Sequence, residues 1–144
     1  MQEENVLELS QRVLIIDDEE HIRLLLKETL QTSYEVNLQN SGDSAIEAVK
    51  ESLELDQPFG VAIMDLNMPG MLGTTVAKKL RELDERIHLI LMTGESKSVS
   101  EIVDESFRQN LILVRKPFAL DEIIMLTQYL FKTWKLARTL EHQS

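Results

Sequence analysis

The sequence predicts an α/β domain, in which five strands alternate with five helices as a (βα)₅ unit around one parallel sheet. Three observations support this prediction. Five short apolar runs recur along the chain, the segments between them carry apolar residues at helical spacing, and the length of 144 residues suits a single core. The composition agrees, because 43% hydrophobic residues suffice for one core and argue against a disordered chain.

The five expected strands are short runs, most of them rich in valine, isoleucine or leucine. They cover residues 12–16, 34–38, 60–64, 88–92 and 111–114. Four of these runs are almost unbroken in apolar character, which is typical of parallel strands covered on both faces. The second run contains Glu35 and Asn37, so we expect it at an edge of the sheet.

The intervening segments have apolar residues at intervals of three and four and therefore predict helices. In chain order the stripes are Ile22, Leu25, Leu26, Thr29 and Leu30; Ala45, Ile46, Val49 and Leu53; Leu72, Val76, Leu80 and Leu83; Val99, Ile102, Val103 and Phe107; and Ile123, Leu126, Leu130, Trp134, Ala137 and Leu140. Ser41, Gly42 and Asp43 supply capping chemistry at the start of the second helix.

The last helix is expected to be longer than the sheet beneath it. From Leu120 to Leu140 it would measure about 30 Å, whereas a strand spans about 17–20 Å. Its final two turns should therefore overhang, with Trp134 on or near the overhang. The overhang is either a frayed tail or a partner contact, namely a homodimer through the last helix or a stalk that leads into an output domain. We accordingly divide the chain into a lead-in (1–11), the folded domain (12–131) and an extension of the last helix with a tail (132–144).

Charge and composition exclude several classes of function. The chain has 25 acidic and 15 basic residues, a net charge of −10, which argues against direct binding to nucleic acid. It has no cysteine, and therefore no disulfide, thiolate metal site or cysteine nucleophile. We expect no signal peptide from its first residues, and no apolar run reaches the roughly 18 residues of a membrane span. We expect a cytoplasmic protein that does not act at a membrane.

Charged or reactive side chains follow four of the five expected strands. Asp17 and Asp18 follow the first, Asp65 the third, Thr93 the fourth and Lys116 the fifth. In an open parallel sheet the carboxyl ends of the strands meet at one edge, where ligands bind. Three carboxylates gathered there repel one another, and Mg²⁺, which prefers oxygen ligands, relieves that repulsion. A carboxylate nucleophile with a metal, a lysine and a hydroxyl indicates phosphoryl transfer onto an aspartate.

Four segments of the chain resemble the receiver domain of two-component response regulators. They are VLIIDDEE at 13–20, VAIMDLNMPGMLG at 61–73, LILMTGES at 89–96 and VRKPF at 114–118. The resemblance extends from about residue 12 to residue 129, and the four motifs together are highly specific. It implies a doubly wound, flavodoxin-like sheet with strand order 2-1-3-4-5.

The resemblance also implies a metal and acceptor site. Asp65 would accept the phosphoryl group and also bind Mg²⁺. Asp18 would bind the ion directly, Asp17 would act mainly through a metal-bound water, and the backbone carbonyl of Asn67 would be a further ligand.

Further residues would connect phosphorylation to a change of conformation. Thr93 would hydrogen-bond the phosphoryl group, Lys116 would contact Asp65 and then the phosphate, and Gly94 would leave the group accessible. The bond between Lys116 and Pro117 would be cis. Many receivers carry tyrosine or phenylalanine where this chain has Leu113, so we expect an atypical output surface.

The implied function is a phosphorylation-controlled switch rather than an enzyme. The protein would catalyse at most its own phosphorylation and dephosphorylation. A histidine kinase or phosphotransfer protein would donate the phosphoryl group. A protein target or an output domain outside this chain would respond to the change of conformation. Alternatives are a phosphorylation-independent scaffold or dimerisation module, and a regulatory fragment of a larger protein. A phosphohydrolase of the haloacid dehalogenase type is disfavoured, because Asn67 stands where its general acid would be.

Overall fold

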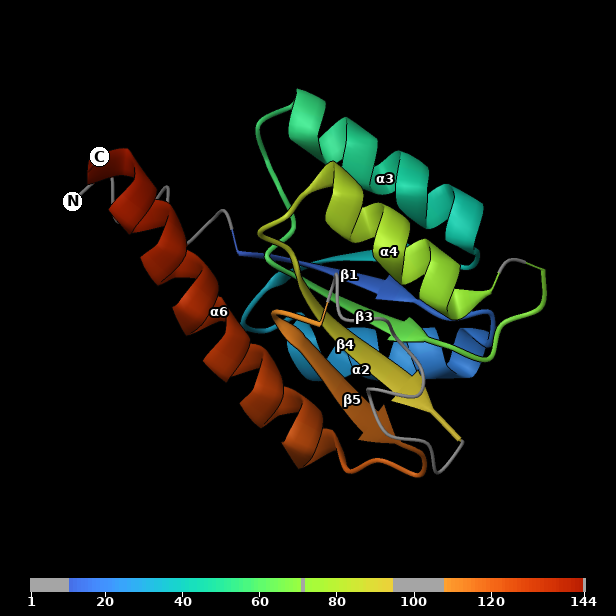
Figure 1. Ribbon diagram of the computed structural model, residues 1–144. Coiled ribbons are helices and arrows are strands. Elements are labelled where there is room, and N and C mark those ends of the chain that lie inside the picture. Colours follow the sequence, from blue (N-terminus) through green and yellow to red (C-terminus); the bar gives the residue numbers. More distant parts are fainter. Residues whose placement is uncertain (1–10, 71, 95–107, 144) are drawn as a thin grey trace.

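The computed structural model describes residues 11–70, 72–94 and 108–143, and its five parallel strands form one sheet of order β2-β1-β3-β4-β5 (Figure 1). The described elements are, in chain order, β1 (Arg12–Ile16), α2 (Glu20–Leu30), β2 (Glu35–Gln39), α3 (Gly42–Glu54), β3 (Val61–Asp65), α4 (Gly73–Leu83), β4 (His88–Thr93), β5 (Leu111–Arg115) and α6 (Leu120–Gln143). The predicted fold class and strand order are confirmed. The lead-in before residue 11 and the helix expected around 99–107 lie outside the described residues.

Helices cover both faces of the sheet, with α3 and α4 on one face and α2 and α6 on the other (Figure 1). Side chains of a strand alternate between the faces, so each strand contributes to both cores. In β1, Leu14 and Ile16 pack with α3 and α4, whereas Val13 and Ile15 pack with α2 and α6. This arrangement explains why the central runs are apolar at nearly every position.

The two edge strands differ from the buried centre. The expected edge position of β2 is confirmed, and its residues are half-buried or exposed. β5 is the other edge, and only Val114 is buried in it. Its side chains nevertheless pack on both faces of the sheet, as expected: Leu111 and Leu113 lie against the core beneath α3 and α4, and Ile112 and Val114 lie against the core beneath α2 and α6.

Trp134 belongs to the core and not to an overhang. It is only 2% exposed, and its ring meets the edge of Phe131 at a centroid distance of 5.8 Å. Phe131 in turn stacks on Tyr34 at 4.7 Å. Gly60, just before β3, allows this approach, because a Cβ atom there would overlap the Phe131 ring. Trp134 therefore lies near the expected overhang but not on it, because burying its large aromatic ring favours the core.

The overhang of α6 begins beyond Trp134. The helix continues past the amino-terminal ends of the strands (Figure 1), and Leu136 and Leu140 are 61% and 57% exposed. Within the part of the chain that the structure describes, no helix is both long and apolar enough to cross a membrane.

His88, the first residue of β4, makes stability depend on pH. It is 2% exposed, and burial, together with the positive charge of Arg81, lowers its pKa to about 4. In the unfolded chain the His88 imidazole takes up a proton near pH 6.5, whereas in the folded protein it does so only near pH 4. The stabilising contribution is therefore complete above about pH 6.5 and is lost as the pH falls toward 4.

We expect this loss to reach about 3 kcal/mol of unfolding free energy at a pH of about 4. Urea unfolding of the natural protein and of His88→Gln, each measured across this pH range, isolates the contribution. The stability advantage of the natural protein should shrink by that amount on acidification. An advantage that does not change with pH would show that His88 is protonated alike in both states.

Candidate functional site

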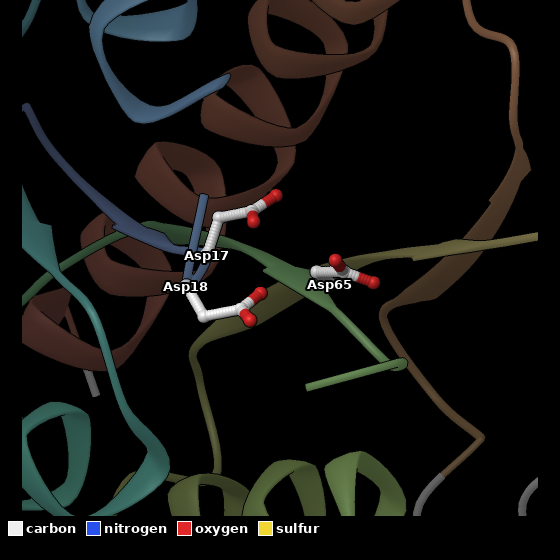
Figure 2. Close-up of side chains that lie close together, drawn as sticks. All are labelled: Asp17, Asp18 and Asp65. Carbon is white, nitrogen blue, oxygen red and sulfur yellow. The ribbon is translucent and has the colours of Figure 1, made fainter. Parts of the chain in front are cut away.

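Three carboxylates meet at the carboxyl ends of the central strands. Asp17 and Asp18 directly follow β1, and Asp65 is the last residue of β3. Each offers a carboxylate oxygen, and these atoms all lie within 4.8 Å of one another. Figure 2 shows Asp17 and Asp18 extending from the end of β1 toward Asp65. Asp17 and Asp65 are buried and Asp18 is exposed, so the cluster opens to solvent on one side.

Asp17 is held rigidly, yet it keeps one oxygen without a partner. Its Oδ1 accepts a hydrogen bond of 3.0 Å from the Glu19 amide, and its backbone carbonyl accepts one of 2.7 Å from Arg23. Its Oδ2 is buried and has no hydrogen-bond partner among the described residues. Burial chiefly raises the pKa of Asp17, and the negative charges of Asp65 and Asp18 raise it further. A cation at this position would relieve both effects.

Asp65 is held by two donors. Its Oδ1 accepts from the Asn67 amide at 2.9 Å, and its Oδ2 accepts from Lys116 Nζ at 2.9 Å. Burial by itself would lower the pKa of Lys116, but the hydrogen bond to Asp65 and that residue's charge outweigh it, and the pKa is raised. Lys116 is therefore a cation at neutral pH, and it orients one oxygen of a carboxylate that is 3% exposed.

The loop after β3 is packed closely behind Asp65. The Leu66 amide donates to the Met92 carbonyl at 2.9 Å, which continues the pairing of β3 with β4. A Cβ atom at Gly73 would lie 2.7 Å from Leu66 Cα, so only glycine lets α4 begin this close. Leu72, which the helical stripe assigns to the core, precedes this helix as its N-cap and is 72% exposed.

Thr93 and Lys116 lie on adjacent strand ends. Thr93 is the last residue of β4 and 1% exposed, and its carbonyl accepts from the Lys116 amide at 2.8 Å. The bond between Lys116 and Pro117 is cis. A Cβ atom at Gly94 would meet none of the described residues within 4 Å. Leu113 is half-buried and packs against the core beneath α3 and α4.

Two contributors to the site were missed in the sequence. The Asn67 side chain accepts from the Gly94 amide at 3.3 Å and links the loop after β3 to the end of β4. Arg23 binds the backbone of Asp17 from one turn inside α2. The position of Asn67 two residues after Asp65 was a usable signal, since asparagine bonds nearby amides in turns. No sequence signal marked Arg23, because whether its side chain reaches the backbone of Asp17 depends on how α2 packs on the sheet.

The donor set fits a divalent cation. Two carboxylate charges about 4 Å apart repel by roughly 4 kcal/mol at an effective dielectric constant of about 20. The cluster places three such groups together and supplies one ammonium, from Lys116. The buried Oδ2 of Asp17, which has no hydrogen-bond partner among the described residues, adds an oxygen that could face the ion or a water bound to it. Hard oxygen donors with an open side are what Mg²⁺ prefers, since it retains several waters.

Comparison with known proteins gives a consistent family assignment. The family model described as the response regulator receiver domain matches residues 13–128. The transcriptional regulatory protein SrrA of Staphylococcus aureus is 31% identical over 126 residues, which are 86% of this chain and 49% of SrrA. The chain therefore spans about half the length of the curated relatives that it matches.

Solved structures share the fold over most of the chain. An adenylate cyclase from Rhodopirellula baltica has a TM-score of 0.81 and 26% identity, covering 92% of this chain and 96% of that chain. A CheY-like receiver domain protein from Methanospirillum hungatei has a TM-score of 0.72 at 20% identity, with 88% and 98% covered. Chemotaxis response regulator CheY4 of Vibrio cholerae has a TM-score of 0.71 at 25% identity, with 83% and 98% covered.

Proposed function

Since the chain belongs to the response regulator receiver domain family, we propose that Asp65 is its phosphoryl acceptor and that Mg²⁺ at the acidic cluster is required for the transfer. A receiver domain is a phosphorylation-controlled switch of two-component signalling. The residue assignment rests on the position of Asp65. Its carboxylate oxygen lies within 4.8 Å of a carboxylate oxygen of Asp17 and of Asp18, and the carboxylate accepts a hydrogen bond from Lys116.

The chemistry is a substitution at phosphorus. A carboxylate oxygen of Asp65 forms the new P–O bond, while the bond from phosphorus to the donor's histidine nitrogen breaks and its electron pair stays on that nitrogen. Asp18 would bind the metal directly, Asp17 largely through a water, and the Asn67 carbonyl would complete the protein ligands. When bound, Mg²⁺ neutralises charge on the carboxylates and on the phosphoryl oxygens. The protein thus promotes its own phosphorylation and dephosphorylation without turning over a substrate.

Lys116 and Thr93 would convert the new charge into a change of conformation. Lys116 is paired with Asp65 before phosphorylation and would move its ammonium onto the phosphoryl oxygens afterwards. The Thr93 hydroxyl would bond the same group. Both residues lie at the ends of the strands β4 and β5, so their displacement would change the surface formed by β5 and α6. The helix expected around 99–107 would share in this change.

The partners follow from the same role. A sensor histidine kinase or a phosphotransfer protein would supply the phosphoryl group. The output would be a protein target or a further domain, and SrrA, which is about twice as long as the matched region, is a transcriptional regulatory protein. A scaffold that keeps only the fold remains the competing function, and it predicts no phosphorylation at all.

Removal of the metal tests the proposal. With a small phosphodonor such as acetyl phosphate and Mg²⁺, the intact mass of the protein should increase by one phosphoryl group. Excess EDTA should reduce the rate at least about a hundredfold, because the carboxylates and the incoming group then repel each other without compensation. Restoring Mg²⁺ should restore the rate. Equal incorporation with and without the chelator would contradict the metal role, and no incorporation in either case would favour the scaffold.

A further inference from the structure

A pocket of about 410 Å³ lies at the amino-terminal ends of β4 and β5, at the opposite edge of the sheet from the acidic cluster. It is lined by the end of α4 and the loop after it, by His88 at the start of β4, and by Asn110 just before β5. The last helix, α6, runs past this edge of the sheet (Figure 1) and forms another wall of the pocket. A pocket of this size accommodates a small molecule.

His88 is a buried polar residue in the wall of this pocket. It is 2% exposed, and its backbone amide donates a hydrogen bond of 2.9 Å to the Gly60 carbonyl, so the sheet fixes its position. Its Nδ1 is buried and has no hydrogen-bond partner among the described residues. Since buried side-chain nitrogens nearly always have a partner, this atom indicates a place where a ligand gains a hydrogen bond.

Arg81, in the last turn of α4, contributes a second unpartnered atom to the same pocket. Its two terminal nitrogens donate to the backbone carbonyls of Gln109 and Asn110, the second at 3.1 Å. Its Nε is buried and has no partner within the part of the chain that the structure describes. Burial lowers the pKa of Arg81, and the negative charge of Asp84 offsets this effect only in part. An anion beside the guanidinium would supply the missing compensation.

The charges around the pocket favour a negative ligand. Arg81 and Arg86 are cations, whereas Glu85 is the one carboxylate among the described residues that line it. Glu85 is exposed, so its carboxylate stays solvated and free to turn away. The pocket thus concentrates positive charge on a chain whose net charge is −10. It differs in this respect from the acidic cluster, which favours a cation.

From these observations we propose that this pocket binds a small organic molecule through an oxyanion group, either a carboxylate or a phosphate. Arg81 and Arg86 would supply positive charge, and His88 would supply a hydrogen-bond donor in the tautomer that carries its proton on Nδ1. A bound ligand would contact both the sheet and α6, since α6 forms one wall. The pocket and Asp65 lie at opposite edges of the sheet, so this inference does not depend on phosphorylation.

Titration of the ¹⁵N-labelled full chain with inorganic phosphate, and separately with succinate, tests the proposal. EDTA keeps the acidic cluster free of metal, and the ionic strength is held constant with chloride. We expect saturable amide shifts at Arg81, His88 and Asn110, and the probe that binds more tightly identifies the preferred oxyanion. Arg81→Gln should weaken binding at least about tenfold. Lys50→Gln removes the same charge from an exposed position on α3 and should bind as the natural protein does.

A second variant tests the pocket while Arg81 keeps its bonds to the residues before β5. Ala137 is an exposed residue of α6 that lines the pocket, so Ala137→Glu should repel the anion and weaken binding at least about tenfold. Thr139→Glu is the matched control, because it adds the same charge about 200° further around the helix, and it should leave binding unchanged. The absence of saturable shifts with both probes would overturn the proposal. Equal binding by Ala137→Glu and Thr139→Glu would overturn it as well.

Discussion

Replacing Asp65 with asparagine is expected to reduce phosphoryl incorporation by at least about a thousandfold, or about 4 kcal/mol in activation free energy. The amide lacks the charged oxygen that attacks phosphorus, and it removes one of the three carboxylates around the metal position. Its carbonyl oxygen can still accept the hydrogen bond that Asp65 receives from the Asn67 amide, so the loop after β3 should keep its shape. Incorporation is measured by intact mass after incubation with acetyl phosphate and Mg²⁺.

Asp43→Asn is the matched control for this variant. Asp43 is an exposed carboxylate in the first turn of α3 and does not belong to the cluster, so its loss should leave the rate unchanged. Circular dichroism would show that both variants are folded. Incorporation into Asp65→Asn at the natural rate would mean that another residue is the acceptor.

Replacing Lys116 with alanine is expected to separate phosphorylation from the change of conformation. The variant removes the ammonium that lies 2.9 Å from Asp65 Oδ2, but it leaves the carboxylates in place. Phosphorylation should therefore slow by no more than about tenfold, since the metal still supplies charge stabilisation. The phosphorylated variant should lack the shifts in amide resonances of β5 and α6 that the natural protein shows with beryllofluoride and Mg²⁺.

Lys116→Arg distinguishes charge from geometry at this position. Arginine keeps the positive charge but presents a planar fork rather than a compact ammonium. If charge alone were sufficient, this variant would switch normally. We expect it to be phosphorylated with a reduced amide response. Complete switching of Lys116→Ala would contradict the role assigned to Lys116.

The fold was predictable because the buried strands are marked by composition alone. β1, β3 and β4 are apolar at nearly every position, and the polar residues of β2 correctly indicated an edge. The second strand begins one residue later than expected, at Glu35. The ring of Tyr34, which was assigned to the strand, stacks on Phe131 of α6. A local apolar pattern cannot reveal such a contact between distant segments.

The acidic cluster could be anticipated because it follows from topology. Residues that follow parallel strands arrive at one edge whatever the side-chain packing, so Asp17, Asp18 and Asp65 were identified together. The burial of Trp134 and the contact of Arg23 with Asp17 depend instead on how α6 and α2 lie on the sheet. Helical spacing shows that a residue lies on a stripe, but not how far along the helix the sheet extends beneath it.

The central claim is that Asp65 is the acceptor, and locating the phosphoryl group in the natural protein tests it most directly. After phosphorylation with Mg²⁺, reduction by borohydride converts an aspartyl phosphate to homoserine, and peptide mass spectrometry then identifies the altered position. The account predicts conversion at Asp65 alone, and none when Mg²⁺ is withheld. Conversion at Asp17, Asp18 or any other carboxylate, with Asp65 unchanged, would contradict it.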